Sequence, residues 1–258
     1  MSKAWIFVVV NQKGGVGKTT TAVNTAAAMA RAGKRVVLVD LDPQGNATMG
    51  CGIDKRGLSR SVYQVLLGLE TAQSVRCATE FGFDLLPANR DLAAAELELV
   101  DLADREQRLK QAIDSMADRH DELILIDCPP SLSMLTLNAL CAAHGVIIPM
   151  QCEYYALEGL SDLVNTIRKV QLNFNPQLSM LGLLRVMFDA RITLAQQVSE
   201  QLAEHFGDKV FQTVIPRNVR LAEAPSHGMP GIVFDPSSRG AKAYTSFGAE
   251  LLERLSTL

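Results

Sequence analysis

The sequence predicts an α/β fold, a mostly parallel, twisted sheet with helices on both of its faces. Short runs rich in Val, Ile and Leu alternate along the 258 residues with longer stretches of helical periodicity, and this alternation is typical of parallel sheets. Most of these runs are continuously apolar, as expected for strands buried on both faces. A glycine-rich segment separates the first run from the first helical stretch, which gives the strand–loop–helix order of a βαβ unit.

Each apolar run predicts one strand. The predicted strands cover residues 5–10, 35–40, 83–88, 123–128, 145–150, 180–188 and 209–216. Helical periodicity predicts helices over residues 18–32, 156–172, 194–206 and 240–255, and Gly33 is placed to end the first of them. The sequence contains no obvious linker, internal repeat or low-complexity tract. We therefore expect a single domain over residues 1–258.

The segment 90–120 is rich in charged residues and has its own periodicity. Leu102, Leu109, Ile113 and Met116 lie at helical spacing with charges between them. This pattern predicts an amphipathic helix with one solvated face, because a coiled coil would need the repeat to persist over more heptads.

Charge and cysteine content limit the classes of function. The formal net charge is −3, so any binding of nucleic acid must come from a local basic patch. The five cysteines are odd in number and form no C-x-x-C pair, which favours buried, inert thiols in a reduced cytoplasmic compartment. The four histidines show no metal-ligand spacing. No apolar run reaches transmembrane length, and the N-terminal run is interpreted as a strand rather than a signal peptide.

The segment NQKGGVGKTT, residues 11–20, nearly matches the phosphate-binding pattern G-x-x-x-x-G-K-[ST], with Gln12 in place of the first glycine. Its glycines let the backbone curl so that several N–H groups face an anion, and the next helix adds its N-terminal donors. Lys18 supplies charge to the terminal phosphates, and Thr19 offers a hydroxyl ligand for Mg²⁺. The predicted nucleotide-binding residues of this loop are Lys13, Gly14, Gly15, Val16, Gly17, Lys18, Thr19 and Thr20.

Acidic residues follow two other predicted strands. Asp127 ends the run LILID, where an open α/β sheet presents its ligand residues, so it is predicted to hold Mg²⁺ directly or through water. Asp40 and Asp42 lie two residues apart at the end of another strand, on the same side if the strand continues that far. We expect one of these carboxylates, Asp42 before Asp40, to orient an attacking water; ordinary strand-end aspartates are the alternative.

Lys13 is a second lysine in the loop, and its role is open at this point. The backbone wraps its phosphates so closely that a side chain at position 13 is poorly placed to turn back onto them. Lys13 is therefore either a solvated loop lysine or a group that reaches the phosphates of a second copy, as an arginine finger does.

Five motifs in order give the chain a specific resemblance. KGGVGKTT, VDLDPQGNAT, LIDCPPSL, PMQCEYYALEGL and VIPRNVRLAEAPSHG together resemble the chromosomal ParA (Soj) partition ATPases, and the likeness covers nearly the whole chain. This family has a P-loop NTPase fold of the deviant Walker A type, named for the additional lysine that corresponds to Lys13. The resemblance also leads us to expect a bulky aliphatic residue where this sequence has Gly231.

The resemblance implies a homodimer that forms with ATP, with Mg²⁺ as the second cofactor. Lys13 would then cross the dimer interface, and Asp42 would be required for hydrolysis, which makes Lys13, Lys18 and Asp42 the predicted catalytic residues. Pro216 and Asn218 correspond to the loop that holds the base, although a plain strand-to-helix turn is the alternative for this segment.

The resemblance also implies partners and a location. The ATP-bound dimer would bind double-stranded DNA without sequence preference through Arg191 and Arg220, for which solvated surface arginines are the alternative. A ParB-like centromere-binding protein would stimulate hydrolysis during chromosome segregation. We expect a cytoplasmic, nucleoid-associated protein with no membrane partner. Since twelve residues precede Lys13, we expect no N-terminal helix-turn-helix of the kind that plasmid relatives carry.

Two other classes of protein share parts of this pattern. A MinD-like cell-division ATPase has the two-lysine loop but anchors to membranes through a basic amphipathic C-terminal helix, whereas the segment SFGAELLERLSTL has few cations and indicates a helix packed on the core. An electron-transfer iron protein of the nitrogenase type would need a cysteine pair at its dimer axis. Cys128 lies in the magnesium motif, and the other cysteine spacings do not fit such a pair.

Overall fold

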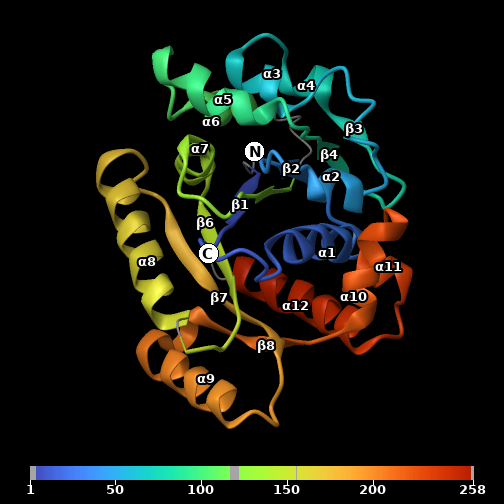
Figure 1. Cartoon of the computed structure of the whole chain (residues 1–258), viewed down its shortest axis with the longest axis vertical. Coiled ribbons are helices and arrows are strands. Elements are labelled where there is room, and N and C mark those ends of the chain that lie inside the picture. The colour runs from blue at the N-terminus through green and yellow to red at the C-terminus, as the bar shows by residue number, and fades with distance from the viewer. Residues whose placement is uncertain (1–3, 117–121, 155, 257–258) are drawn as a thin grey trace.

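A computed structural model describes residues 4–116, 122–154 and 156–256 (Figure 1). Its centre is an eight-stranded sheet in the order β3-β4-β2-β5-β1-β6-β7-β8. The strands are β1 Trp5–Val9, β2 Val36–Asp40, β3 Cys77–Ala78, β4 Asp84–Leu86, β5 Leu123–Asp127, β6 Gly145–Met150, β7 Ser179–Phe188 and β8 Val210–Pro216. All neighbouring strands are parallel except β3, which runs antiparallel to β4. The prediction of a mostly parallel sheet is confirmed.

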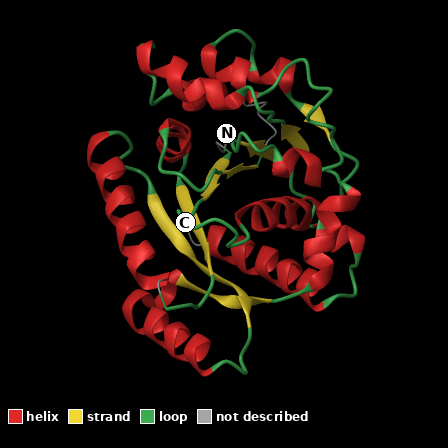
Figure 2. Cartoon of the chain, in the orientation of Figure 1, coloured by secondary structure: helices red, strands yellow, loops and turns green. Residues whose placement is uncertain are grey.

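Helices cover both faces of this sheet (Figure 2). The α-helices of the described residues are α1 Lys18–Arg31, α2 Asn46–Gly50, α3 Val62–Leu67, α4 Ala72–Val75, α5 Leu92–Glu98, α6 Arg108–Met116, α7 Met134–Ala142, α8 Ala156–Asn173, α9 Thr193–Phe206, α10 Val219–Glu223, α11 Gly231–Phe234 and α12 Arg239–Leu255. Short 3-10 helices are η1 Leu99–Asp101, η2 Gly207–Lys209 and η3 Ala224–His227.

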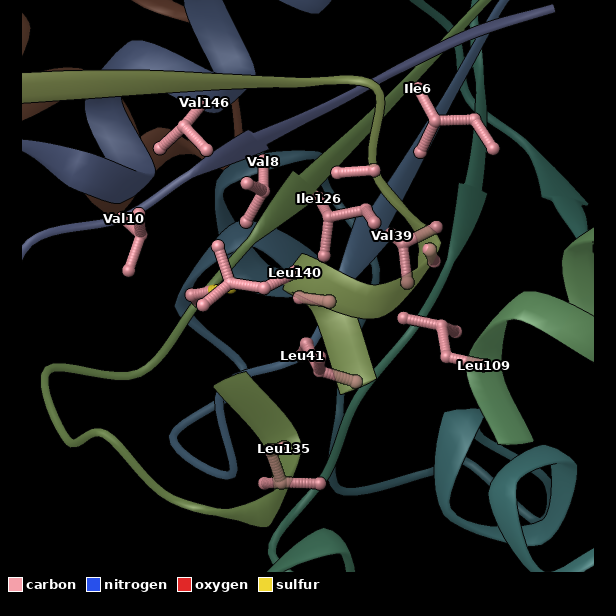
Figure 3. Packing of buried hydrophobic residues seen from close by; sticks show 14 of the residues in the cluster. Ile6, Val8, Val10, Val39, Leu41, Leu109, Ile126, Leu135, Leu140 and Val146 are labelled. Carbon is pink, nitrogen blue, oxygen red and sulfur yellow. The ribbon is translucent and has the colours of Figure 1, made fainter. Parts of the chain in front are cut away.

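The sheet divides the hydrophobic core into two clusters. Along β1, Ile6 and Val8 belong to one cluster and Phe7 and Val9 to the other, because successive side chains of a strand point to opposite faces. Helices α3 to α9 contribute to the cluster of Ile6, and α1, α2, α10, α11 and α12 to the cluster of Phe7. Figure 3 shows the first cluster, in which Val8, Val39 and Ile126 come from adjacent strands.

The predicted strands and long helices are confirmed within one to three residues at most ends. Gly33 follows the end of α1 with φ 82°, and the N–H of Lys34 beyond it donates to the Met29 carbonyl, so the predicted helix stop is confirmed. The sequence analysis missed the two-residue strand β3 and the short helices, which are too brief to show a period.

The prediction of one amphipathic helix over 90–120 is wrong. The segment forms α5, η1 and α6, separated by a break in which Asp104 adopts φ 51°, a left-handed conformation that ends helical hydrogen bonding. The apolar pattern still marks the buried side, because Leu109, Ile113 and Met116 are buried on α6. Residues 117–120 of the segment lie outside the described residues.

Gly231 begins α11, and its small size has a packing reason. A Cβ added there would lie 2.5 Å from Cδ2 of Leu221 and 3.2 Å from Oδ1 of Asn24. That same Asn24 oxygen accepts a hydrogen bond from the N–H of Ile232. Glycine therefore fits at 231, where the family resemblance led us to expect a bulky aliphatic residue, because α11 packs closely on α1 and α10 in this chain.

The remaining features of the core agree with the sequence analysis. Helix α12 buries Tyr244, Phe247 and Leu251, so its apolar face is part of the core and not a free amphipathic surface. The cysteines are free thiols, and all of them are buried except the half-buried Cys77. None of the helices in the described ranges is both long enough and apolar enough to cross a membrane.

Candidate functional site

Three neighbouring strands bring the predicted site residues to one edge of the sheet. The order β2-β5-β1 places the ends of these strands side by side, and Asp127 on β5 pairs in register with Val9 of β1 and Asp40 of β2. The glycine loop leaves β1 two residues beyond Val9 and leads into α1 (Figure 1). This carboxyl edge is where open α/β sheets bind their ligands.

The loop has the backbone shape that an anion site requires. Gly15 and Gly17 adopt φ angles of 74° and 75°, a left-handed conformation that favours glycine. No side chain caps the first turn of α1, so the N–H groups there remain available to a ligand. Val16 is buried and anchors the loop, while the N–H of Lys13 donates to Asn11 Oδ1.

Lys18 is the buried cation of the loop. Its side chain is 7% exposed, and its ammonium donates to the Lys13 carbonyl at 3.0 Å. Burial lowers the pKa of Lys18, while the carboxylates of Asp127 and Asp42 oppose that shift. Thr19 and Thr20 follow it on the half-buried first turn of α1. Among the described residues this cation has one hydrogen-bond partner, a carbonyl, so it is suited to bind a phosphate oxygen.

Asp40 and Asp127 lie opposite each other in the β2–β5 ladder and are fully buried, but only one of them is satisfied. Asp40 accepts hydrogen bonds from the Thr48 hydroxyl and N–H, each at 2.7 Å, and from the Asp42 N–H at 3.2 Å. Neither carboxylate oxygen of Asp127 has a hydrogen-bond partner among the described residues. Asp40 therefore serves the local structure, whereas the oxygens of Asp127 lie near the Thr19 hydroxyl, which lowers the pKa of Asp127, and remain available to a ligand.

Burial is also the main cause of the unusual titration of these two groups. It raises the pKa of Asp40 to about 6, although the hydrogen bonds from Thr48 oppose the shift. Burial raises the pKa of Asp127 well above its ordinary value, and the neighbouring Asp40 carboxylate raises it further. Each of two close buried carboxylates disfavours the charged form of the other, and a nearby cation opposes that effect.

The residues around Asp127 fit a magnesium ion. The unpartnered oxygens of Asp127 and the Thr19 hydroxyl are the hard oxygen ligands that Mg²⁺ prefers. The described residues include no cluster of three His, Cys, Asp or Glu side chains that could hold a metal alone. This is consistent with Mg²⁺, which is commonly held by one or two protein ligands together with substrate phosphates and water.

Asp42 lies beyond the end of β2, where the strand geometry on which its orientation was predicted no longer holds. Its side chain is 7% exposed, and Oδ1 accepts a hydrogen bond from the Gln44 N–H at 2.9 Å. It is close enough to Lys18 and Asp127 to affect the pKa of each. The structure therefore brings Asp42, Lys18 and Asp127 together.

Lys13 is exposed, and its side chain forms an ion pair with Glu153. Its ammonium lies 2.5 Å from Oε2 of Glu153, which follows β6. The sequence analysis did not single out Glu153, because it is 140 residues away in the chain and no spacing rule connects the two. Lys13 thus contacts Glu153 in this chain, and its predicted reach to a second copy stays a prediction.

Pro216 and Asn218 join the loop in one cavity. A cavity of about 150 Å³ is lined by Gly17 and Thr20 of the loop side and by Pro216, Arg217 and Asn218 after β8. Asn218 also caps α10, because its Oδ1 accepts from the Leu221 N–H at 3.3 Å. The segment is thus a strand-to-helix turn and a cavity wall at the same time.

Other residues of the cavity could not be found from the sequence. Met187 contributes to the wall and adopts φ 51°, and its sulfur accepts from Gln151 Nε2, which also reaches the Gly15 carbonyl at 3.2 Å. Tyr244 of α12 closes another side and bonds Thr21 at 3.0 Å. Only the tertiary fold brings these residues together, so no local pattern predicts them.

The two predicted DNA-binding arginines lie on the surface in ion pairs. Arg191 is 89% exposed and binds Asp189 with Nε and one terminal nitrogen, at 2.9 and 2.6 Å. Arg220 lies 2.8 Å from Glu223 and 3.5 Å from Asp235. Both arginines are accessible to a partner, but each would have to exchange a carboxylate for it.

The parallel sheet, the glycine loop with a buried lysine and the acidic carboxyl edge define a P-loop nucleotide-binding protein of the α/β class. A family profile described as "AAA domain" matches residues 4–180. The chain is 53% identical over 247 residues to the sporulation initiation inhibitor protein Soj of Bacillus subtilis, covering 95% of this chain and 97% of that protein. It is also 53% identical over 247 residues to the chromosome-partitioning ATPase Soj of Thermus thermophilus, covering 96% and 95%.

A solved structure is similar over the same length. It is the cobyrinic acid a,c-diamide synthase of Mycobacterium smegmatis with a bound ATP analogue and magnesium, at 41% identity, a TM-score of 0.87 and coverage of 99% of this chain and 97% of that one. The chain belongs to the ParA/Soj family of chromosome-partitioning ATPases. This membership agrees with the resemblance of the five motifs and disfavours the electron-transfer alternative.

Proposed function

We propose that this protein is a partition ATPase that dimerises with ATP, binds DNA without sequence preference and hydrolyses ATP when a ParB-like protein stimulates it. The observation that carries the proposal is the convergence of Lys18, Asp42 and Asp127 at the carboxyl edge of the sheet, in a member of this ATPase family. The chain acts as a single domain in the cytoplasm and associates with the nucleoid.

ATP is the substrate and Mg²⁺ the metal of this site. The uncapped start of α1 and the loop N–H groups bind the phosphates, and Lys18 neutralises their charge. Asp127 and Thr19 hold Mg²⁺, which when bound offsets charge on the phosphate oxygens. The cavity bounded by Thr20, Pro216 and Asn218 receives the base.

The remaining residues of the site act on water and on a second copy. Asp42, held by the Gln44 N–H, orients the attacking water for transfer of the terminal phosphoryl group. Lys13 leaves Glu153 and reaches the phosphates bound by the partner copy, where it adds charge as an arginine finger does. Its exposure and its weak, exchangeable pairing with Glu153 support this role in trans.

The test is DNA binding by the purified protein without nucleotide, with ADP and with ATP, each in the presence of Mg²⁺. We expect a labelled duplex to bind with ATP and to bind weakly or not at all in the other two states. Lys18→Ala with ATP is the control, because it removes the cation of the phosphate site. DNA binding that does not depend on nucleotide would contradict the proposal, and ATP-dependent binding to anionic vesicles in place of DNA would favour a MinD-like function.

A further inference from the structure

Asp42 begins a tight turn that sets the direction of its own side chain. The N–H of Gly45 donates to the Asp42 carbonyl at 2.8 Å, which closes a four-residue turn from Asp42 to Gly45. Within this turn the N–H of Gln44 donates to Oδ1 of the Asp42 side chain at 2.9 Å. The orientation of the carboxylate therefore depends on the peptide units on either side of Gln44.

A lysine beyond α2 binds the same turn from outside. The ammonium of Lys55 donates a hydrogen bond to the Gln44 carbonyl, which belongs to the same peptide unit as the Gly45 N–H. This peptide unit is therefore held at both ends, at its N–H by Asp42 and at its carbonyl by Lys55. A cation at the carbonyl also polarises the amide and strengthens the hydrogen bond that the N–H donates.

The side chain of Lys55 is committed to this turn. In the described part of the chain it forms no ion pair, and the carboxylate of the preceding Asp54 accepts from the Arg56 N–H at 3.0 Å instead. The half-buried stem of Lys55 packs over Gly45, because a Cβ added to that glycine would lie 2.9 Å from Lys55 Cδ. Both the stem and the ammonium of Lys55 thus contact the turn that begins at Asp42.

The segment that carries Lys55 has fixed support on both sides. The N–H of Ile53 donates to the Thr48 carbonyl at 3.2 Å, and the hydroxyl and N–H of Thr48 hold Asp40 at the end of β2. Gly52 packs against the residue that follows η3, since a Cβ added to Gly228 would lie 3.0 Å from Gly52 Cα. A lysine on such a supported segment is suited to hold another group in place.

We propose that Lys55 is a positioning residue for ATP hydrolysis, whose hydrogen bond to the Gln44 carbonyl holds Asp42 in the orientation that the attacking water requires. This inference rests on the role that the proposed function gives to Asp42, and it deepens that role. A misplacement of about 1 Å can lower the rate of a catalysed reaction by about a hundred-fold. Loss of the Lys55 ammonium should therefore slow the chemical step and leave the binding of ATP unchanged.

Three variants test the role of Lys55. Lys55→Met keeps an apolar stem over Gly45 and removes the ammonium. Lys55→Arg keeps a cationic donor that can reach the Gln44 carbonyl. Arg56→Met is the matched control, because it removes a cation from the next residue, which is exposed and bonds within this loop through its backbone N–H.

The measurement is the release of phosphate from radiolabelled ATP with Mg²⁺ over a range of ATP concentrations, which gives kcat and KM. Lys55→Met should lower kcat by about 10- to 100-fold and keep the wild-type KM. Its sedimentation as a dimer with ATP and its melting temperature without nucleotide should also match the wild type. Lys55→Arg should recover most of the lost turnover, and Arg56→Met should behave as the wild type.

The outcomes separate this inference from the proposed function. A wild-type protein that releases no phosphate from ATP would overturn both. A wild type that hydrolyses ATP, with a Lys55→Met protein of normal kcat, would overturn the role of Lys55 alone. A raised KM with unchanged kcat would assign Lys55 to nucleotide binding, and a lowered melting temperature without recovery in Lys55→Arg would assign it to the fold. Either of these two results would also overturn the positioning role.

Discussion

The ammonium of Lys13 lies 2.5 Å from the Glu153 carboxylate of the same chain, so the lysine expected to act on a second copy is held by its own subunit. Both side chains are about half exposed, at 51% and 48%, and an exposed ion pair contributes only about 0–1 kcal/mol. The contact is therefore weak enough to be exchanged on dimerisation.

Glu153→Gln should favour the ATP-bound dimer. The substitution removes the charge that competes for Lys13 in both subunits, which relieves up to about 2 kcal/mol per dimer, so the dimer should form up to about thirty-fold more readily. Lys13→Ala should impair the dimer. Sedimentation of both variants with ATP and Mg²⁺ measures the effect, and a Lys13→Ala protein that dimerises normally would exclude a role in trans.

Lys18→Ala should abolish productive binding of ATP. The ammonium is buried beside the loop and is directed at the Lys13 carbonyl, and charge stabilisation provides most of the catalysis in phosphoryl transfer. Nucleotide affinity is measured by titration with a fluorescent ATP analogue, and turnover by phosphate release. Unchanged affinity and turnover would remove the basis of the whole site assignment.

Asp42→Ala should separate binding from chemistry. Asp42 accepts from the Gln44 N–H and lies outside the Asp40–Thr48 hydrogen bonds that hold the end of β2, so the fold and ATP affinity should survive. Hydrolysis should stop because no carboxylate orients the water. The variant should sediment as a dimer with ATP and release no phosphate; a monomer under these conditions would assign Asp42 to dimerisation instead.

Gly231→Val should destabilise the fold. The added Cβ would lie 2.5 Å from Leu221, and overpacking of this kind costs about 1–3 kcal/mol. Gly159→Ala is the control, since a Cβ at that position of α8 meets nothing within 4 Å and should stabilise the helix by about 0.5–1 kcal/mol. Urea unfolding of the nucleotide-free proteins measures both changes. A Gly231→Val protein as stable as the wild type would show that α11 can move away from Leu221.

Local sequence patterns predicted the long strands and helices and the turns that contain glycine. Central strands such as β5 are continuously apolar because both faces of the sheet are covered, and Gly15 and Gly17 adopt the left-handed conformations that their residue type suggests. The break at Asp104 was not predictable, because an aspartate seldom adopts φ 51° and the apolar spacing continues on the far side of the break.

The candidate site shows the same division. The loop and Asp127 are readable because one motif or one strand end defines each of them. Glu153, Met187 and Tyr244 are brought to the site from three other elements, and nothing near them in the sequence indicates a ligand. Hydrogen bonding also changed the interpretation of Asp40. The Thr48 hydroxyl and N–H satisfy its carboxylate, and only the folded structure could distinguish it from Asp127.

The two arginines predicted to bind DNA should not contribute equally. Arg191 has one carboxylate partner, Asp189, whereas Arg220 lies between Glu223 at 2.8 Å and Asp235 at 3.5 Å. A phosphate that binds Arg220 must therefore displace more negative charge and approach two carboxylates. We expect Arg191 to make the stronger phosphate contact.

Arg191→Ala should bind ATP and dimerise normally but lower the salt slope of DNA binding by about two, because each subunit loses one phosphate contact worth roughly 0.9. Arg220→Ala should lower the slope by less. The loss should be the same for duplexes of unrelated sequence, since phosphate contacts position a protein without reading bases. Anisotropy titrations over salt with two such duplexes give all three comparisons. A larger change in the salt slope for Arg220→Ala than for Arg191→Ala would mean that Glu223 and Asp235 move away from Arg220 on DNA binding. A loss of affinity in Arg191→Ala that is confined to one duplex would mean that Arg191 contacts bases.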